Sequence, residues 1–526
     1  MKRLLIITLA AAACLLSCRK HTFSWPGGED PYGEEEFSHE MMIIGEKLED
    51  PYTVDNMTKA LNSLYPTKAG NIKLEATHYY VRFLPSDENQ YDRLVRMGLV
   101  LMDHPLDCRV IRDGDYYHDP EVDEDDITWQ YAVVGTDFIF PPGIKYEIID
   151  DCYISDVVPG TRSEDGIDWS SVEAESYRLT GNSELLSSGT KSELSGTPHG
   201  RITILDEAYD SEPVGVAGVR VACNSFVKMA HTYTDEEGYY EISKNFTSMV
   251  RYRLVFKNVK GFGIGFNLIL TPASSSTLGK HEPEGYSIDI DSSSERKLFT
   301  RCVVNNAGYD YYNSCSKDGS RIKTPPSNLR LWLFQNLNTG SAVMLQQGAY
   351  IDSSTIGEYL GEYSFLVKIF LPDITLGLRG LESYSQIYAL ATHEMAHASH
   401  FMQAGKKFWD NYIRYIVKSF VTSGGTTYGT GSGDGSGYCE VGEMWAYYVQ
   451  TKLYRERYKE STAVFGTSFW FSPQILLYMD DRGLDRFKLF SAFTSDVNDR
   501  NSLQTKLVSL YPEEKTVINH AFSRYN

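Results

Sequence analysis

Residues 383–404 read SYSQIYALATHEMAHASHFMQA, and the motif His393-Glu-Met-Ala-His397 at their centre is the strongest chemical signal of the chain. Glu394 is the only formally charged residue among these 22, which predicts a helix that is buried on most sides. Two histidines four residues apart lie on one helix face, so both imidazoles can reach the same ion. Glu394, next to the first histidine, can then reach a water molecule held on that ion.

The lone carboxylate of this helix separates two interpretations. In the first, His393 and His397 are ordinary core side chains and Glu394 is accidental. A buried carboxylate without a partner is strongly unfavourable, and the helix contains no lysine or arginine. We therefore favour the second interpretation, in which the motif holds a metal ion.

A zinc site needs a third protein ligand and keeps a further position for water. His400 lies on the same helix face as His393, but about 10 Å along the axis, which is too far to share one ion. We expect His400 to support the site or to face a substrate. Downstream, residues 423–437 form a glycine-rich loop, in which Asp434 is an alternative ligand.

Two glutamates on the helix expected from Tyr438 onward are better candidates for the third ligand. Glu440 lies in the first turn, where a carboxylate interacts favourably with the helix dipole, so it has a structural reason to be there. Glu443 lies a turn deeper, before Trp445 and an apolar run, where a carboxylate needs a cation. We therefore expect Glu443 to complete the site.

The N-terminus has the features of an export signal. Lys2 and Arg3 precede an apolar run from Leu4 to Leu16, which is too short to span a bilayer stably. The ending Leu15-Leu-Ser-Cys18 resembles the bacterial lipobox, which implies acylation of Cys18 and attachment to the cell envelope, most simply the outer membrane. Two or three acyl chains anchor a protein stably. The alternative is an ordinary signal peptide with a chance cysteine.

His393-Glu-x-x-His397, followed by a helix with Glu443-Met-Trp-Ala, resembles the gluzincin metallopeptidases. The order from lipobox through Pro372-Asp-Ile to this helix pair is similar to zinc-dependent metalloproteinase lipoproteins of Bacteroidetes-type bacteria. The segments Thr128-Trp-Gln-Tyr-Ala-Val-Val and Leu179-Thr-Gly-Asn look similar too.

This resemblance implies a lipid-anchored zinc endopeptidase that cleaves proteins or peptides. It places zinc on His393, His397 and Glu443, with Glu394 as the general base. Thermolysin-like members carry Asp four residues after the ligand glutamate, where this chain has Tyr447, so the partner of the histidines stays unassigned. The donor to the oxyanion is open among Tyr438, Tyr447, Tyr448 and His400, and residues 424–437 form either a mobile flap or a plain surface loop.

Composition excludes some partners. The chain has 526 residues and a formal charge of −20, with 42% hydrophobic and 23% charged residues. The length predicts two to four domains. An excess of acidic charge argues against a nucleic-acid binder, which needs a basic surface, and against a polybasic membrane-surface protein.

The expected fold is multidomain α+β. Segments Pro213–Val221 and Thr234–Ile242 resemble carboxypeptidase-regulatory-like domains, which are small β-sandwiches. Residues 235–238 could hold calcium, but a hairpin turn is the simpler interpretation. The predicted parts are a signal peptide (1–18), a tether (19–40), a small α+β domain (41–155), a linker with a helical patch at Trp169–Leu179 (156–197), a β-sandwich (198–272) and a mostly helical zincin-like domain with a short sheet (273–526).

Two further expectations concern cysteines and a competing function. Six cysteines remain after the signal peptide, without the short paired spacing of a zinc knuckle, and we expect most to be buried small residues. The competing function is a non-catalytic adhesin or binding lipoprotein on a degenerate zincin fold. Glu394 argues against that function, because binding alone needs no general base.

Overall fold

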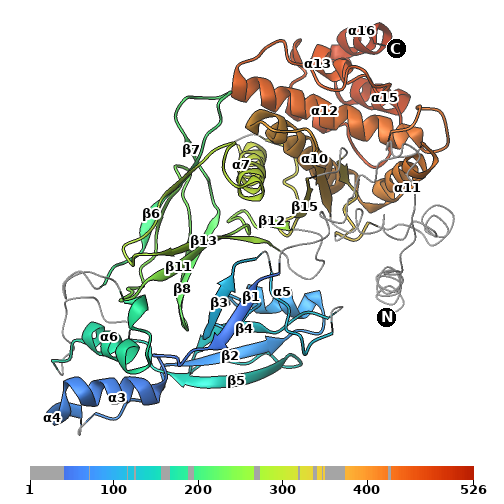
Figure 1. Cartoon of the computed structure of the whole chain (residues 1–526). Helices are drawn as coiled ribbons and strands as arrows, with labels where there is room; N and C mark the ends of the chain where they lie inside the picture. The colour runs from blue at the N-terminus through green and yellow to red at the C-terminus, as the bar shows by residue number, and fades with distance from the viewer. Residues whose placement is uncertain are drawn as a thin grey trace.

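The computed structural model describes residues 41–525 apart from 70–71, 115, 124–125, 156–165, 187–194, 266–272, 318–319, 336–339, 346, 350–372 and 424–427. The signal peptide, Cys18 and the tether therefore lie outside the described residues. The apolar segment 366–371, whose sequence predicts a strand, also lies outside them. The chain is mixed α/β, with several small sheets and a helical C-terminal part (Figure 1). Among the described helices, none combines the length and apolar character needed to cross a membrane.

The N-terminal unit, residues 41–186, contains a three-stranded antiparallel sheet and a two-stranded ribbon. The sheet has the order β4-β2-β5 and the ribbon pairs β1 with β3. The amphipathic pattern of the sequence predicts a helix over Tyr91–Met102, and both of these ends are wrong. The helix, α5, runs from Glu88 to Arg96, and Gly98 follows with a φ of +83°, a left-handed conformation that stops a helix. The bounds are β1 Ile43–Lys47, α3 Val54–Leu64, α4 Pro66–Ala69, β2 His78–Leu84, β3 Cys108–Arg112, β4 Gln130–Gly135 and β5 Lys145–Cys152.

Part of the expected linker belongs to this unit. The predicted helical patch is confirmed as α6, Trp169–Leu179, capped by Asp168 and followed by the short helix η1, Ser183–Leu185. Trp169 and Val172 share a buried cluster with Leu61 of α3. Serine-rich composition indicated a linker here, but the apolar face of α6 packs on the N-terminal unit.

The middle of the chain forms two four-stranded sheets. One has β6 at its centre and the other has the order β13-β11-β8-β9. Their inner faces contribute to one buried core, for example Ile204 of β6 with Val221 of β8 and Leu254 of β11. The bounds are β6 His199–Ile204, β7 Val214–Gly215, β8 Arg220–Ser225, β9 Lys228–Tyr233, β10 Tyr239–Glu241, β11 Val250–Val255, β13 Ser275–His281 and β14 Ile288–Ile290.

These sheets extend past the expected boundary at residue 272, because β13 pairs with β11 and β14 pairs with β6. The segment considered for calcium is a turn before β10. Asp235 Oδ1 accepts a hydrogen bond from the Tyr239 amide at 2.8 Å, and Gly238 has a φ of +85°.

The third sheet lies beside the C-terminal helices and has the order β12-β15-β17-β16. β12, β15 and β17 are mutually parallel, whereas β16 pairs antiparallel with β17 at the edge. Asp373, directly before β17, connects β15 to the segment after β16. Its side chain accepts hydrogen bonds from the Arg330 amide and from the amide and side chain of Gln347. The bounds are β12 Gly263–Gly265, β15 Arg330–Phe334, β16 Ser341–Ala342 and β17 Ile374–Gly377.

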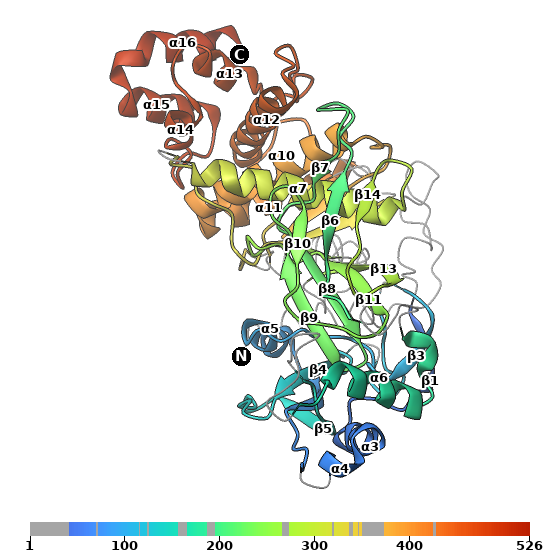
Figure 2. The same ribbon diagram turned by 90° about the vertical axis from the view of Figure 1, so that its left-hand side faces the viewer.

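Two long helices next to this sheet carry the candidate site residues: the first contains the His393–His397 motif and the second contains Glu443. The predicted buried helix is α10, Tyr384–Ala404, which begins with a capping box at Ser383 and ends at Gly405. It packs against α7, Arg296–Ser316, and against α12, Ser436–Tyr458 (Figure 2). The remaining helices are α11 Lys406–Ser423, α13 Gln474–Asp480, α14 Arg486–Phe490, α15 Arg500–Leu510, η3 Pro512–Glu514 and α16 Lys515–Arg524.

The cysteines of the described chain match the sequence expectation. All six are free, and five of them are buried; Cys108 is half-buried. Cys302 and Cys315 lie thirteen residues apart on the single helix α7, roughly 20 Å along its axis, which is too far for a disulfide.

Candidate metal centre

The two histidines and Glu443 meet in the core between α10 and α12. His393 and His397 are 3% and 1% exposed, and Glu443 is 1% exposed. Glu443 Oε2 lies 3.3 Å from His393 Nε2, and Glu443 Oε1 lies 3.4 Å from His397 Nε2. The ligand atoms of these three side chains lie within 4.8 Å of one another, close enough to hold one metal ion. Among the histidine, cysteine, aspartate and glutamate side chains of the described residues, this is the group that meets that condition.

The spacing of these atoms fits a small tetrahedral ion. Zinc binds imidazole nitrogen and carboxylate oxygen at about 2.0–2.2 Å, so neighbouring ligand atoms around it lie roughly 3.3 Å apart. The separations of 3.3 and 3.4 Å are close to that value, although they join the histidines to different oxygens of Glu443, and the ligand atoms of the whole group lie within 4.8 Å of one another. In addition, Glu443 Oε2 makes no hydrogen bond within the described chain. Two imidazoles and one carboxylate form a donor set suited to a divalent metal ion such as zinc.

Two side chains that the motif did not reveal hold the ligands in place. Gln450 Oε1 lies 3.2 Å from His393 Nδ1, and Tyr412 donates a hydrogen bond to Glu443 Oε1 at 2.7 Å. When Gln450 accepts from Nδ1–H, the Nε2 lone pair of His393 faces the site. Gln450 follows Glu443 by seven residues, two helical turns on the same face, and this spacing was the available sequence signal. Tyr412 comes from α11, so no local pattern indicated it.

Glu394 borders the ligand group and lies against the sheet edge. Its side chain is 3% exposed and its Oε2 makes no hydrogen bond within the described chain. A Cβ at Gly340, just before β16, would stand 2.3 Å from Glu394 Oε1. Because residue 340 is a glycine, the Glu394 carboxylate can lie directly against the backbone there. Any larger residue at position 340 would displace the carboxylate.

The pKa values of the site follow from burial and from the charges nearby. Burial raises the pKa of Glu394 well above its usual value, and the Glu443 carboxylate raises it further. Burial lowers the pKa of His393, while Glu443 opposes that shift. Burial also acts to raise the pKa of Glu443, but His397 and His393 outweigh it and hold that pKa well below its ordinary value. These shifts favour a neutral His393 imidazole and an ionised Glu443 carboxylate, which are the forms in which the two groups bind a metal ion.

Three other candidates lie outside the ligand group. Glu440 forms an ion pair with Arg500 at 2.7 Å. Asp434 is exposed in the glycine-rich loop. His400 is fully buried and lies among the rings of Phe408, Trp409 and Phe493, so it packs in the core and faces no substrate.

The tyrosines differ in their distance from the site. The Tyr447 ring centroid lies 4.3 Å from that of His393, and its hydroxyl lies 3.3 Å from the hydroxyl of Tyr428. The sequence did not indicate Tyr428, since it lies in the glycine-rich loop. Tyr438 packs on Phe408, and the buried Tyr448 contacts Trp445. Of the four residues considered as an oxyanion donor, Tyr447 is the one whose ring packs on a ligand histidine.

A cavity of about 310 Å³ opens beside these groups. Gly340 and Gln450 form part of its wall, so it reaches both the Glu394 side and the His393 side of the site. Leu390 of α10 and Phe465 give it apolar walls, and Arg379 also lines it.

Comparisons of the chain with protein-family models, with curated proteins and with solved structures found no match.

Proposed function

We propose that this protein is a zinc-dependent metallopeptidase that hydrolyses peptide bonds in proteins or peptides. The observation that supports this function best is the buried group of His393, His397 and Glu443 with Glu394 beside it. If these residues had only a structural role, uncharged side chains would fill this part of the core at a lower cost. Instead, one carboxylate lies against two histidines, and a second carboxylate has an oxygen, Glu394 Oε2, that makes no hydrogen bond in the described chain.

Each residue of the site has a defined task. His393, His397 and Glu443 would bind zinc, which supplies Lewis-acid chemistry toward a peptide carbonyl and a water molecule. Glu394 accepts the proton of the attacking water at its carboxylate and then donates it to the leaving amine. The Tyr447 hydroxyl, beside that of Tyr428, is the proposed donor to the oxyanion.

The architecture around the site supports a gluzincin-type assignment. A parallel sheet with one antiparallel edge strand, β16, lies next to the helix that carries the motif. The edge can hold an extended peptide, because an edge strand has unpaired backbone groups, and the 310 Å³ cavity beside Glu394 offers space for a substrate side chain. In the same proposal, the two middle sheets form a carboxypeptidase-regulatory-like sandwich.

The location of the enzyme is a separate proposal. Leu15-Leu-Ser-Cys18 supports cleavage before Cys18 and acylation of that cysteine. The mature enzyme would then be attached to the cell envelope, at the outer membrane, with its substrate-binding part outside the bilayer.

The test is a proteolysis assay with the wild type, Glu394→Gln and Glu440→Gln, each loaded with zinc. We expect the wild type and Glu440→Gln to cleave an unfolded protein substrate, and Glu394→Gln to lose at least 10²-fold in rate, since it lacks the proton acceptor. Equal inactivity of all three, with zinc bound, would favour the non-catalytic binding protein instead.

A further inference from the structure

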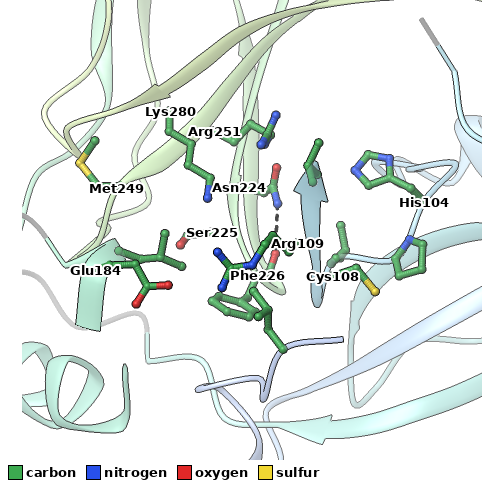
Figure 3. Close-up of a pocket in the computed structure, with 15 residues that line it drawn as sticks. His104, Cys108, Arg109, Glu184, Asn224, Ser225, Phe226, Met249, Arg251 and Lys280 are labelled. Carbon is green, nitrogen blue, oxygen red and sulfur yellow. Dashed lines mark hydrogen bonds between the residues drawn. The ribbon is translucent and has the colours of Figure 1, made fainter. Parts of the chain in front are cut away.

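A second cavity lies far from the metal centre, where the N-terminal unit meets the β13-β11-β8-β9 sheet. Its volume is about 160 Å³. Arg109 of β3 lines it from one side, and Asn224 of β8, Arg251 of β11 and Lys280 of β13 line it from the other (Figure 3). In Figure 1 this place lies at the opposite end of the middle sheets from α10 and α12.

The sheet brings several positive charges to one face. Arg251 of β11 stands directly opposite Lys280 of β13 in the antiparallel register, an arrangement of like charges that destabilises a sheet. Arg253 lies two residues further along β11 and therefore on the same face. Tyr252 and Leu254, which alternate with these arginines, are buried in the core on the other face.

The carboxylates nearby compensate these charges incompletely. Arg251 pairs with Asp113, and Arg109 pairs with Glu46 at 2.9 Å. Lys280 forms no ion pair with a carboxylate of the described chain, and neither does Arg253.

Arg253 is buried, with 8% of its surface exposed. Its guanidinium contacts neutral groups, the Met102 sulfur at 3.2 Å and Asn224 Oδ1 at 3.4 Å. Burial lowers the pKa of Arg253 to about 10, and the charge of Arg251 adds to this effect. The pKa of Lys280 is lowered by the same two causes.

The geometry of the cavity favours an anion. In Figure 3, the side chains of Lys280 and Arg109 point into the space beside Asn224. Glu184 is the carboxylate among the lining residues of the described chain, and its negative charge acts on Lys280, so it offsets part of the positive charge of the cavity. A cavity of about 150 Å³ holds one benzene molecule, so a phosphate ion or a short carboxylate fits here.

We propose that this cavity is a binding site for a small oxyanion, a phosphate or carboxylate group held between Lys280 and Arg109. Arg109 provides a planar guanidinium donor and Lys280 provides an ammonium group, a combination typical of sites for these anions, while the charge of Arg251 on the cavity wall adds to the positive potential. A bound anion would also offset the repulsion between Arg251 and Lys280. The occupied site would then strengthen the contact between the N-terminal unit and the middle sheet.

The test compares the melting temperature of the full chain in phosphate, in succinate and in chloride at equal ionic strength. The variants are Lys280→Gln and Arg109→Gln, with Lys73→Gln as the control, because Lys73 is an exposed lysine outside the cavity. We expect phosphate or succinate to raise the melting temperature of the wild type and Lys73→Gln above its value in chloride. In Lys280→Gln and Arg109→Gln, the rise should fall to less than half.

The anion that gives the larger rise identifies the group that the site prefers. In chloride, Lys280→Gln should be at least as stable as the wild type, because the substitution removes the cross-strand repulsion. Equal melting temperatures of the wild type in all three salts, or an undiminished rise in both variants, would overturn the proposal. Arg109 is half exposed, so Arg109→Gln should fold even if Lys280→Gln does not.

Discussion

At the scale of single residues, the contacts around His393 decide how well the site holds its metal. Gln450 is 7% exposed and lies 3.2 Å from His393 Nδ1. Outer partners of this kind set the tautomer and the orientation of a ligand histidine, and their loss typically costs about 10–100-fold in metal affinity.

We therefore expect Gln450→Ala to bind zinc about 10–100-fold more weakly than the wild type. Competition with a fluorescent chelator would measure the dissociation constant. Gln504→Ala is the control, because Gln504 is a half-buried residue of α15 that donates a hydrogen bond to Asn519 of α16 and takes no part in the metal centre. Unchanged affinity in Gln450→Ala would show that His393 is oriented without this contact.

Two tyrosines that are adjacent in the sequence give a matched pair of variants. The Tyr447 ring packs on His393, whereas the Tyr448 hydroxyl is buried without a hydrogen bond in the described chain. We expect Tyr447→Phe to lower kcat by about 10²–10³-fold while zinc stays bound, as for the loss of one oxyanion donor. Tyr448→Phe should leave kcat unchanged. Equal rates for both variants, measured by steady-state kinetics, would assign the donor elsewhere.

At the scale of elements, Asp373 connects β15, β17 and the segment after β16. It is fully buried, and burial raises its pKa to about 6, although its hydrogen bonds with Gln347 and Arg330 oppose the shift. A carboxyl group with a raised pKa in the folded state loses its proton first in the unfolded state. Its contribution to stability is therefore greatest below about pH 4 and falls as the pH rises from there to about 6.

The difference in unfolding free energy between the wild type and Asp373→Asn should then shrink by roughly 2 kcal/mol between about pH 4.5 and 7. Urea denaturation at both pH values measures this difference directly. A difference that is constant or grows with pH would contradict the burial of an uncharged carboxyl group at this position.

Local patterns predicted the elements well when the signal was short-range. The helical patch Trp169–Leu179, the strand His78–Leu84 and the buried helix of the motif were all visible in the sequence. Of the candidates for the third ligand, the structure brings Glu443 to the histidines. The depth of Glu443 in the helix, on which its selection was based, agrees with its burial beside the histidines.

Contacts between distant segments could not be predicted in this way. Tyr412 reaches Glu443 from another helix, and Tyr428 reaches Tyr447 from a loop. The strand Ser275–His281 is serine-rich and half-exposed, so only its pairing with β11 reveals that it belongs to the middle sheets. The placement of α6 likewise depends on α3, more than a hundred residues earlier.

At the scale of the whole molecule, a buried ion pair joins the N-terminal unit to the middle sheets. Lys228 of β9 lies 2.9 Å from Glu173 of α6, and both side chains are almost fully buried. Tyr52 also donates a hydrogen bond to Glu173. Such a pair adds little net stability compared with apolar residues, but removal of one partner leaves a buried charge without compensation.

We expect Lys228→Met to lower the free energy of unfolding by about 3–5 kcal/mol. The double variant Lys228→Met/Glu173→Gln should recover much of this loss, because the uncompensated charge is gone and the introduced amide oxygen would still accept a hydrogen bond from Tyr52. Chemical denaturation of the wild type, both single variants and the double variant gives the coupling energy. Additive effects would show that the two side chains act independently.

The zinc content of the purified protein, measured by mass spectrometry of the metal, tests the central claim most directly. We predict one zinc per chain in the wild type, in Glu394→Gln and in Glu440→Gln, because none of these changes touches a ligand. Glu443→Ala should lose most of its zinc. A full equivalent of zinc in Glu443→Ala, or a wild type that binds none, would contradict the assignment of His393, His397 and Glu443 as the metal centre.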